Sequence, residues 1–158
     1  MIGVVQHVAV VGASGELGQA LAKALAKQGV RLNLWGRDGD RLSNLAAHCL
    51  DLGAAAVELT QTDLSEIECA VEALRTVDRK LALDMVIFAQ GLGDTRQPDA
   101  LFDDPMTVDR LVRINFLAPA AMAAGLADSM AHRRKGLIVF VGSVAAFHAL
   151  PFAASYAS

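Results

Sequence analysis

Three glycines spaced three residues apart near the start of the chain could bind a phosphate group. The segment reads Val11-Gly12-Ala13-Ser14-Gly15-Glu16-Leu17-Gly18 and lies between an apolar run and an amphipathic stretch. A pyrophosphate needs a sharp turn, a backbone that it can approach closely, and a helix N-terminus with free N–H groups. Side chains on the glycines would obstruct one of these. The spacing predicts a dinucleotide phosphate site, with a simple tight turn as the alternative.

The elements that must hold this turn alternate between short β-branched runs and longer amphipathic stretches. His7 to Val11 is continuously apolar, as expected of a strand buried on both faces. Gly29 and Gly53 would end the first two helices as C-caps, and Ser65 would cap the third, with Glu68 completing a capping box. The predicted strands are 7–11, 30–35, 55–59, 85–89 and 137–141, and the predicted helices are 15–28, 41–52, 65–77 and 106–132.

This βαβαβαβαβ order predicts both the fold class and the place of the site. Right-handed crossovers turn the order into an α/β fold with a Rossmann-like, doubly wound parallel sheet. We expect one domain over residues 1–158, incomplete at the C-terminal edge of its sheet. Ligands of such sheets bind at the carboxyl ends of the strands. The chemistry is therefore expected at residues 12–18, 36–37, 63 and 89–91, and beyond 142.

Composition and charge exclude several classes of function. The formal net charge is −3, and the densest basic run, His132-Arg133-Arg134-Lys135, suits a solvated helix end, so no nucleic acid is expected. Cys49 and Cys69 have no paired spacing and the four histidines are scattered, which predicts reduced thiols and no metal site. The first apolar run is too short for a signal sequence or a membrane span, so we expect a cytoplasmic protein.

Three further residues resemble the catalytic residues of the short-chain dehydrogenase/reductase family, and the similarity runs through all 158 positions. Asn115 aligns with the family's helix Asn, Ser143 with its catalytic Ser and Tyr156 with its catalytic Tyr. The offset of 13 residues between Ser143 and Tyr156 is the one that this family shows. Asp63, followed by Leu64, matches the Asp that contacts adenine in the family.

The sequence departs from the family pattern at two places. One large subgroup has TGxxxGxG at the glycine turn, whereas this chain has Val11 in place of the Thr and a GxxGxxG spacing, which looks more like the extended or atypical subgroups. The segment Phe88-Ala89-Gln90-Gly91 occupies the NNAG position and keeps only its glycine. The resemblance implies cofactor contacts from Ala89, Gln90 and Gly91, and leaves the stabilising role of that motif open.

The resemblance implies hydride transfer between a nicotinamide and a carbonyl or alcohol carbon. Tyr156 would give or take the hydroxyl proton, and Ser143 would hydrogen-bond the substrate oxygen. With a pKa of about 10, only about one free tyrosine in a thousand is ionised at pH 7. The family lowers that pKa with a lysine four residues later, which would be position 160, and this chain ends at Ser158.

That ending leaves several hypotheses open. We interpret the sequence as a truncated form of an oxidoreductase that is a homo-oligomer at full length. There are two alternatives: a nucleotide-binding module without turnover, and an interaction module that uses an exposed sheet edge. The apolar strand 137–141 would then have an open edge that favours aggregation or dimerisation. His148 lies where the family places substrate-facing residues, although a loop histidine is more often structural.

Pro119 is a second reason to expect a functional role for Asn115, independent of the family resemblance. The proline has no N–H to donate to the carbonyl of Asn115, and its ring pushes against that carbonyl. We infer a local kink that frees this carbonyl to hold a water molecule, which is the role that the family gives its Asn. An ordinary proline kink beside a surface Asn is the alternative.

The end of the second strand predicts which dinucleotide binds. NAD-preferring members place an acidic residue there to bind the ribose hydroxyls. Here Gly36 takes that position and Arg37 follows, which suits the 2′-phosphate of NADP. Asp38 could blunt this preference, and Arg37 could be only a solvated charge. NADP is therefore expected over NAD.

Overall fold

The computed structural model describes residues 5–93 and 103–147, which fold around a parallel sheet. The strand order β3-β2-β1-β4-β5 reverses direction between β1 and β4, and all four pairings are parallel. This confirms the predicted doubly wound sheet. The strands are β1 (His7–Val11), β2 (Arg31–Gly36), β3 (Ala56–Gln61), β4 (Met85–Phe88) and β5 (Leu137–Phe140).

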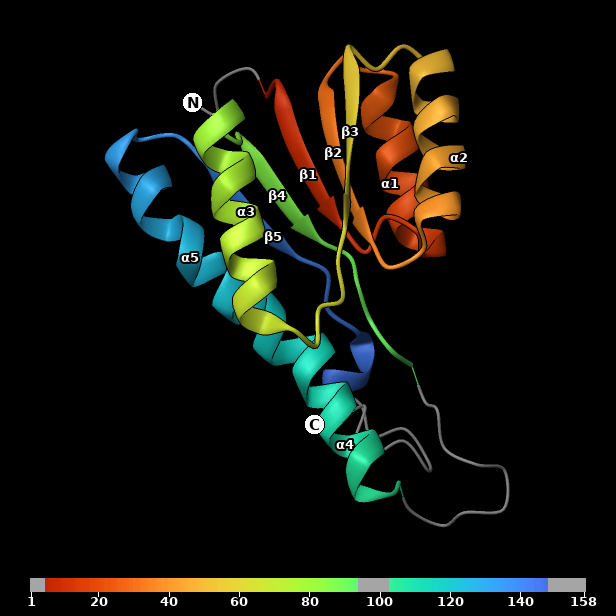
Figure 1. Ribbon diagram of the computed structural model, residues 1–158, viewed down its shortest axis with the longest axis vertical. Coiled ribbons are helices and arrows are strands. Elements are labelled where there is room, and N and C mark those ends of the chain that lie inside the picture. Colours follow the sequence, from red (N-terminus) through yellow and green to blue (C-terminus); the bar gives the residue numbers. More distant parts are fainter. Residues whose placement is uncertain (1–4, 94–102, 148–158) are drawn as a thin grey trace.

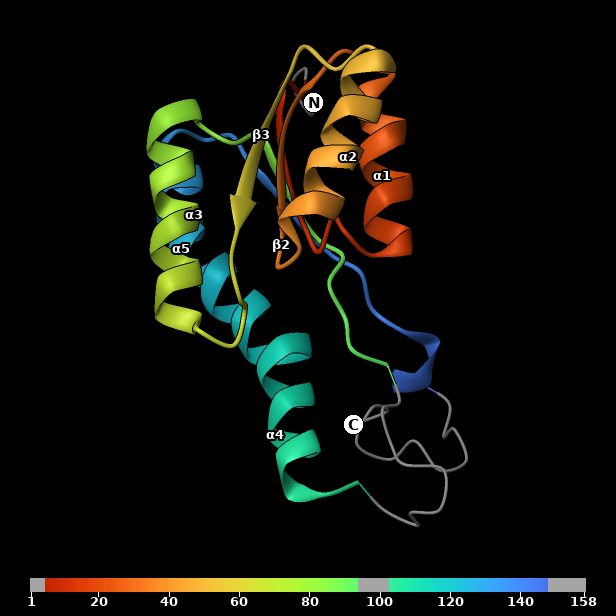
Figure 2. The same cartoon turned by 45° about the vertical axis from the view of Figure 1, so that its right-hand side comes forward.

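Helices cover both faces of this sheet. As Figures 1 and 2 show, α1 (Glu16–Ala26) and α2 (Gly39–Asp51) lie on one face, and α3 (Ile67–Leu81) and α5 (Ala118–His132) lie on the other. The short helix α4 (Pro105–Val112) and the π-helical turn η1 (Arg113–Leu117) run directly into α5. A 3₁₀ turn, η2 (Val144–Ala146), follows β5.

The central strand β1 shows why its residues are continuously apolar. Val8 and Val10 pack in the core under α1 and α2, whereas Ala9 and Val11 pack in the core under α3 and α5. All four are fully buried. Since side chains alternate between the two faces of a strand, a sheet covered on both faces needs apolar residues at every position. The edge strand β3 has several exposed positions instead.

The ends of the first two helices follow the sequence prediction, and the end of the third does not. Gly29 and Gly53 have left-handed backbones just after α1 and α2, with φ of +71° and +106°, a conformation that glycine adopts without steric cost. Helix α3 continues to Leu81, four residues beyond its predicted end. Asp78 explains the extension, because this buried carboxylate accepts hydrogen bonds from the Leu83 N–H and from Arg133, the C-cap residue of α5.

The long helix from Pro105 to His132 is the element that carries Asn115. By length and composition it could cross a membrane, and no other helix within the described ranges could. In this structure Met122 and Leu126 of α5 are buried against α3 and the sheet. That packing places the π-helical turn next to the chain that leaves β4, where Asn115 is hydrogen-bonded to Leu92.

Candidate functional site

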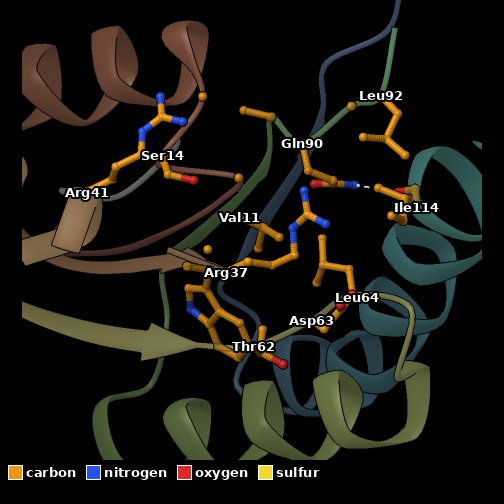
Figure 3. A pocket seen from close by; sticks show the side chains of 16 residues that line it. Val11, Ser14, Arg37, Arg41, Thr62, Asp63, Leu64, Gln90, Leu92 and Ile114 are labelled. Atoms are coloured by element: carbon orange, nitrogen blue, oxygen red, sulfur yellow. Dashed lines mark hydrogen bonds between the residues drawn. The ribbon is translucent and has the colours of Figure 1, made fainter. Parts of the chain in front are cut away.

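The carboxyl ends of the strands surround an open cavity of about 230 Å³. It lies where the strand order reverses, which is where doubly wound sheets bind their ligands. Figure 3 shows the side chains that reach it from β1, β2, the loops after β3 and β4, and the long helix. The lining residues are Val11, Gly12, Ser14, Gly15, Trp35, Gly36, Arg37, Arg41, Thr62, Asp63, Leu64, Ala89, Gln90, Gly91, Leu92 and Ile114.

The glycine turn has no room for side chains at two of its three glycines. Gly12 has φ of +82°, and a Cβ on it would lie 2.5 Å from the Cα of Gln90. A Cβ on Gly18 would lie 2.2 Å from the carbonyl oxygen of Gly12. By contrast, a Cβ on Gly15 would lie 3.4 Å from that oxygen. The fold therefore requires glycine at positions 12 and 18. At position 15 the fold would accept a side chain, and glycine there keeps the space beside the turn open.

The N-terminus of α1 adds hydrogen-bond donors to this turn. Gly15 is the N-cap residue, and no side chain accepts a hydrogen bond from the first turn. Such free N–H groups at the positive end of a helix dipole bind phosphate oxygens. Gly12, Ser14 and Gly15 line the cavity, whereas Glu16, Leu17 and Gly18 do not. The turn thus offers free N–H donors to a phosphate group, and Gly15 is the residue at the start of α1 that lines the cavity.

Two arginines line the cavity near this turn. Arg37 follows β2 directly, and Arg41 lies in the first turn of α2; both are exposed. Asp38 is the N-cap residue of α2, and its Oδ1 accepts a hydrogen bond from the Arg41 N–H at 3.0 Å. The carboxylate expected to blunt an NADP preference is thus engaged in capping a helix. Arg41 was not recognised as a site residue from the sequence, although it stands four residues after Arg37 and begins the predicted helix 41–52.

Asp63 is the second residue of the loop that joins β3 to α3. Its Oδ1 accepts hydrogen bonds of 2.9 Å from both the backbone N–H and the hydroxyl of Ser65. These two bonds, with a smaller effect of the Arg37 charge, hold the pKa of Asp63 below its ordinary value. The prediction that Ser65 caps α3 is wrong, because the helix begins at Ile67 and the Ser65 hydroxyl is bound to Asp63.

The residues after β4 form another part of the cavity wall. The Ala89 N–H donates to the carbonyl of Val11 at 2.9 Å, which extends the pairing of β4 with β1 by one bond. Ala89, Gln90 and Gly91 all line the cavity, together with Leu64 from the neighbouring loop. The backbone expected at the NNAG position is therefore at the site, although Phe88 packs in the core instead.

Asn115 binds the next residue of that wall. Its Oδ1 accepts from the Leu92 N–H at 2.8 Å, and its Nδ2 donates to the Leu92 carbonyl at 2.9 Å. The predicted disturbance of the helix is present as the π-helical turn η1, in which the Ala118 N–H donates to the Arg113 carbonyl. Such turns are frequent at functional sites. The carbonyl role inferred for Asn115 stays a prediction.

The remaining predicted catalytic residues are only partly placed. Ser143 follows β5 and caps the 3₁₀ turn η2, where its Oγ accepts from the Ala145 N–H at 3.2 Å. It does not line the cavity. Tyr156 and His148 lie outside the described residues. No group of three potential metal ligands occurs within residues 5–93 and 103–147.

Trp35, the single tryptophan of the chain, was not recognised as a site residue from the sequence. It is fully buried at the end of β2 and lines the cavity. Its indole Nε1 has no hydrogen-bond partner among the described residues. The cavity therefore contains an intrinsic fluorophore that can report on ligands.

Comparisons with known proteins agree with this geometry. Dehydrogenase/reductase SDR family member 7B of Xenopus laevis is 29% identical over 161 residues, which cover 96% of this chain and 48% of that protein. The bulky-bulky ketone specific alcohol dehydrogenase of Comamonas testosteroni superposes with a TM-score of 0.87 at 26% identity, over 97% of this chain and 61% of that one. A short-chain dehydrogenase of Sphingobium yanoikuyae in complex with NADPH gives 0.87 at 27% identity, over 97% and 59%.

The chain spans about half the length of the curated relatives that it matches first. The family model described as short chain dehydrogenase matches residues 6–158, nearly the whole chain. The fold, the glycine turn and the matched range lead to one assignment. This chain belongs to the short-chain dehydrogenase family.

Proposed function

We propose that this chain binds NADP(H) and forms the nucleotide-binding part of an oxidoreductase that acts on a carbonyl or alcohol substrate. The observation that carries the proposal is the pair Arg37 and Arg41, which line the cavity near a glycine turn whose helix N–H groups are free. A guanidinium binds phosphate oxygens through two parallel hydrogen bonds. Gly36, which stands where NAD-binding members place a carboxylate, leaves room for a 2′-phosphate.

The cavity suggests how the dinucleotide would lie. The adenosine half would lie between Arg37 and the Asp63 carboxylate, where an acidic group can accept from the adenine amino group. The pyrophosphate would lie over Gly15 at the start of α1. The nicotinamide half would then extend toward Asn115 and Ser143, where the chain carries its proposed catalytic groups.

NADP(H), when bound, would supply the hydride acceptor or donor. The residues of the chain would handle the substrate oxygen and its proton. Ser143 would donate a hydrogen bond to that oxygen, since its hydroxyl hydrogen stays available when Oγ accepts from the Ala145 N–H. Tyr156 would exchange the proton, as the family resemblance implies.

A titration tests the cofactor assignment. NADPH and NADH are titrated separately into the chain, with quenching of Trp35 fluorescence as the readout. Arg37→Met should weaken NADPH binding about tenfold or more and leave NADH nearly unchanged. Arg31→Met is the matched control, because Arg31 lies at the opposite end of β2. Equal affinity for both cofactors, unchanged in Arg37→Met, would refute the NADP assignment.

The quaternary state and location are further parts of this proposal. Val108, Val112 and Phe116 lie four residues apart on the long helix and are exposed, Phe116 by 67%. Such an apolar stripe favours pairing with a second copy of the chain. We propose a cytoplasmic homo-oligomer with no membrane contact. Light scattering of the wild-type protein and of Phe116→Ser tests the oligomeric state, because loss of the apolar stripe should favour monomers.

A further inference from the structure

Gln90 contacts both the glycine turn and the long helix. On one side its backbone lies against Gly12, where a Cβ would come within 2.5 Å of it. On the other side its carboxamide reaches the long helix, as Figure 3 shows by the dashed line from Gln90 to Ile114. The residue is half-buried and lines the cavity. Its place in the sequence is that of the Ala in the NNAG pattern.

The carbonyl that Gln90 contacts has lost its usual helical donor. The Gln90 Nε2 donates to the Ile114 carbonyl at 3.4 Å. In an α-helix that carbonyl would accept from the Ala118 N–H, which here donates to the Arg113 carbonyl. In a continued π-helix it would accept from residue 119, which is a proline without an N–H. The Gln90 amide therefore supplies a donor that the backbone cannot.

The other end of the same carboxamide has no partner. The Oε1 of Gln90 is buried and accepts no hydrogen bond from the described residues. A buried acceptor without a donor is costly. Because the terminal torsion of a glutamine is soft and the bond to Ile114 is long, a small rotation can bring Oε1 to the cavity surface. A ligand that offers a donor there would satisfy it.

The donor can be identified by its chemistry. A phosphate has only acceptor oxygens near neutral pH and would be repelled by Oε1. The adenine amino group belongs at the Asp63 end of the cavity. The nicotinamide carboxamide is also a donor, but it lies at the far end of a dinucleotide. The hydroxyls of the second ribose are therefore the donors expected between the Gly12 turn and Asn115.

We propose that the Gln90 side chain binds a hydroxyl of the nicotinamide ribose through Oε1 while its Nε2 holds the Ile114 carbonyl. Ligand binding is thereby linked to the π-helical turn that carries Asn115. This inference rests on the proposed function, since it assumes that the chain binds a dinucleotide.

The test compares a dinucleotide with its adenosine half. Wild-type chain and Gln90→Met, which keeps the length of the side chain, are titrated with NADPH and with adenosine 2′,5′-bisphosphate. Gln90→Met should bind NADPH about tenfold more weakly and the bisphosphate within a factor of two of the wild type. Unchanged affinity for NADPH, or equal loss for both ligands, overturns the proposal.

A second measurement does not depend on the variant. Wild-type chain is titrated with NADPH analogues that lack the 2′- or the 3′-hydroxyl of the nicotinamide ribose. One of the two should bind about tenfold more weakly than NADPH, and equal binding of both overturns the proposal. A wild-type chain that binds neither NADPH nor the bisphosphate would refute the proposed function itself. Binding of both with no effect of Gln90→Met would refute only the role of Gln90.

Discussion

The carboxamide of Asn115 makes two hydrogen bonds to one residue, Leu92, accepting from its N–H and donating to its carbonyl. The long helix is thus bound to the chain that leaves β4. Both backbone groups of Leu92 are satisfied by this single side chain, 23 residues away in the sequence. The Asn115 side chain therefore positions the cavity wall, independently of the water-binding role inferred for its backbone carbonyl.

Asn115→Ala should lower both stability and affinity. The partly buried N–H and carbonyl of Leu92 would each lose a partner, and an unsatisfied group costs about 1–3 kcal/mol when it is buried. Urea denaturation should show a loss in this range, and NADPH titration should show weaker binding. Asn44→Ala is the control, since Asn44 is exposed on α2. If Asn115→Ala matched that control in both measurements, the positioning role would be disproved.

Pro119→Ala should separate stability from function. Alanine restores an N–H that the Ile114 or Asn115 carbonyl can accept, and a proline in a helix interior costs about 3 kcal/mol relative to alanine. We expect a higher melting temperature together with weaker NADPH binding, because the π-helical turn would relax toward α-helix. Pro105→Ala should change little, since Pro105 is the first residue of α4, where the missing N–H costs nothing. A melting temperature unchanged or lowered by Pro119→Ala would contradict the prediction.

Alanine at two glycines of the turn should have opposite consequences. Gly18→Ala would place a Cβ 2.2 Å from the Gly12 carbonyl oxygen, so it should destabilise the fold by about 1–3 kcal/mol or more, as overpacking does. Gly15→Ala meets nothing closer than 3.4 Å and should fold normally. It should nevertheless weaken NADPH binding, because its methyl group would lie where the pyrophosphate approaches. Circular dichroism melts and titration distinguish the two effects. Normal NADPH affinity in Gly15→Ala would place the pyrophosphate elsewhere.

The Ser65 hydroxyl should set part of the pH dependence of binding. Asp63 has a pKa below its ordinary value, so its carboxylate stays ionised, and binding through it persists, until the pH falls through that lowered pKa. Ser65→Ala removes the hydroxyl bond and leaves the backbone bond, so the pKa should rise part of the way. NMR titration of the Asp63 carboxyl should show this rise. Ser43→Ala, on the exposed surface of α2, should not move it.

Arg133→Met should destabilise the fold far from the cavity. Burial raises the pKa of Asp78, but hydrogen bonds from Arg133, Ser129 and Leu83 and the Arg133 charge outweigh it, so the pKa is lowered. Removing one partner of a buried ion pair costs about 3–5 kcal/mol. The contribution of Asp78 to stability is present above the ordinary carboxyl pKa and is lost as the pH falls through the lowered one. Denaturation at pH 7 and pH 3 should therefore show a smaller difference between wild type and variant at pH 3.

Much of the fold could be predicted because its signals are local. A continuous apolar run predicts the burial of β1 on both faces. The left-handed backbones of Gly29 and Gly53 follow from their residue type. Strand boundaries agree with the predictions to within one or two residues. The predicted capping box at Ser65 is wrong because a nearby carboxylate, Asp63, competes for the hydroxyl. Local propensity could not decide between these two partners.

The sequence by itself determined the order of elements, the glycine turn and the edge of the sheet that carries the cavity, because periodicity, glycine spacing and the handedness of crossovers are properties of the chain. Only the tertiary structure decided which side chains meet across that edge. The bonds of Asn115 to Leu92 and of Gln90 to Ile114, and the place of Arg41 on the cavity, depend on how helices pack against the sheet. Such contacts join residues more than twenty positions apart, and their partners are chosen by packing and by the need to satisfy buried polar groups.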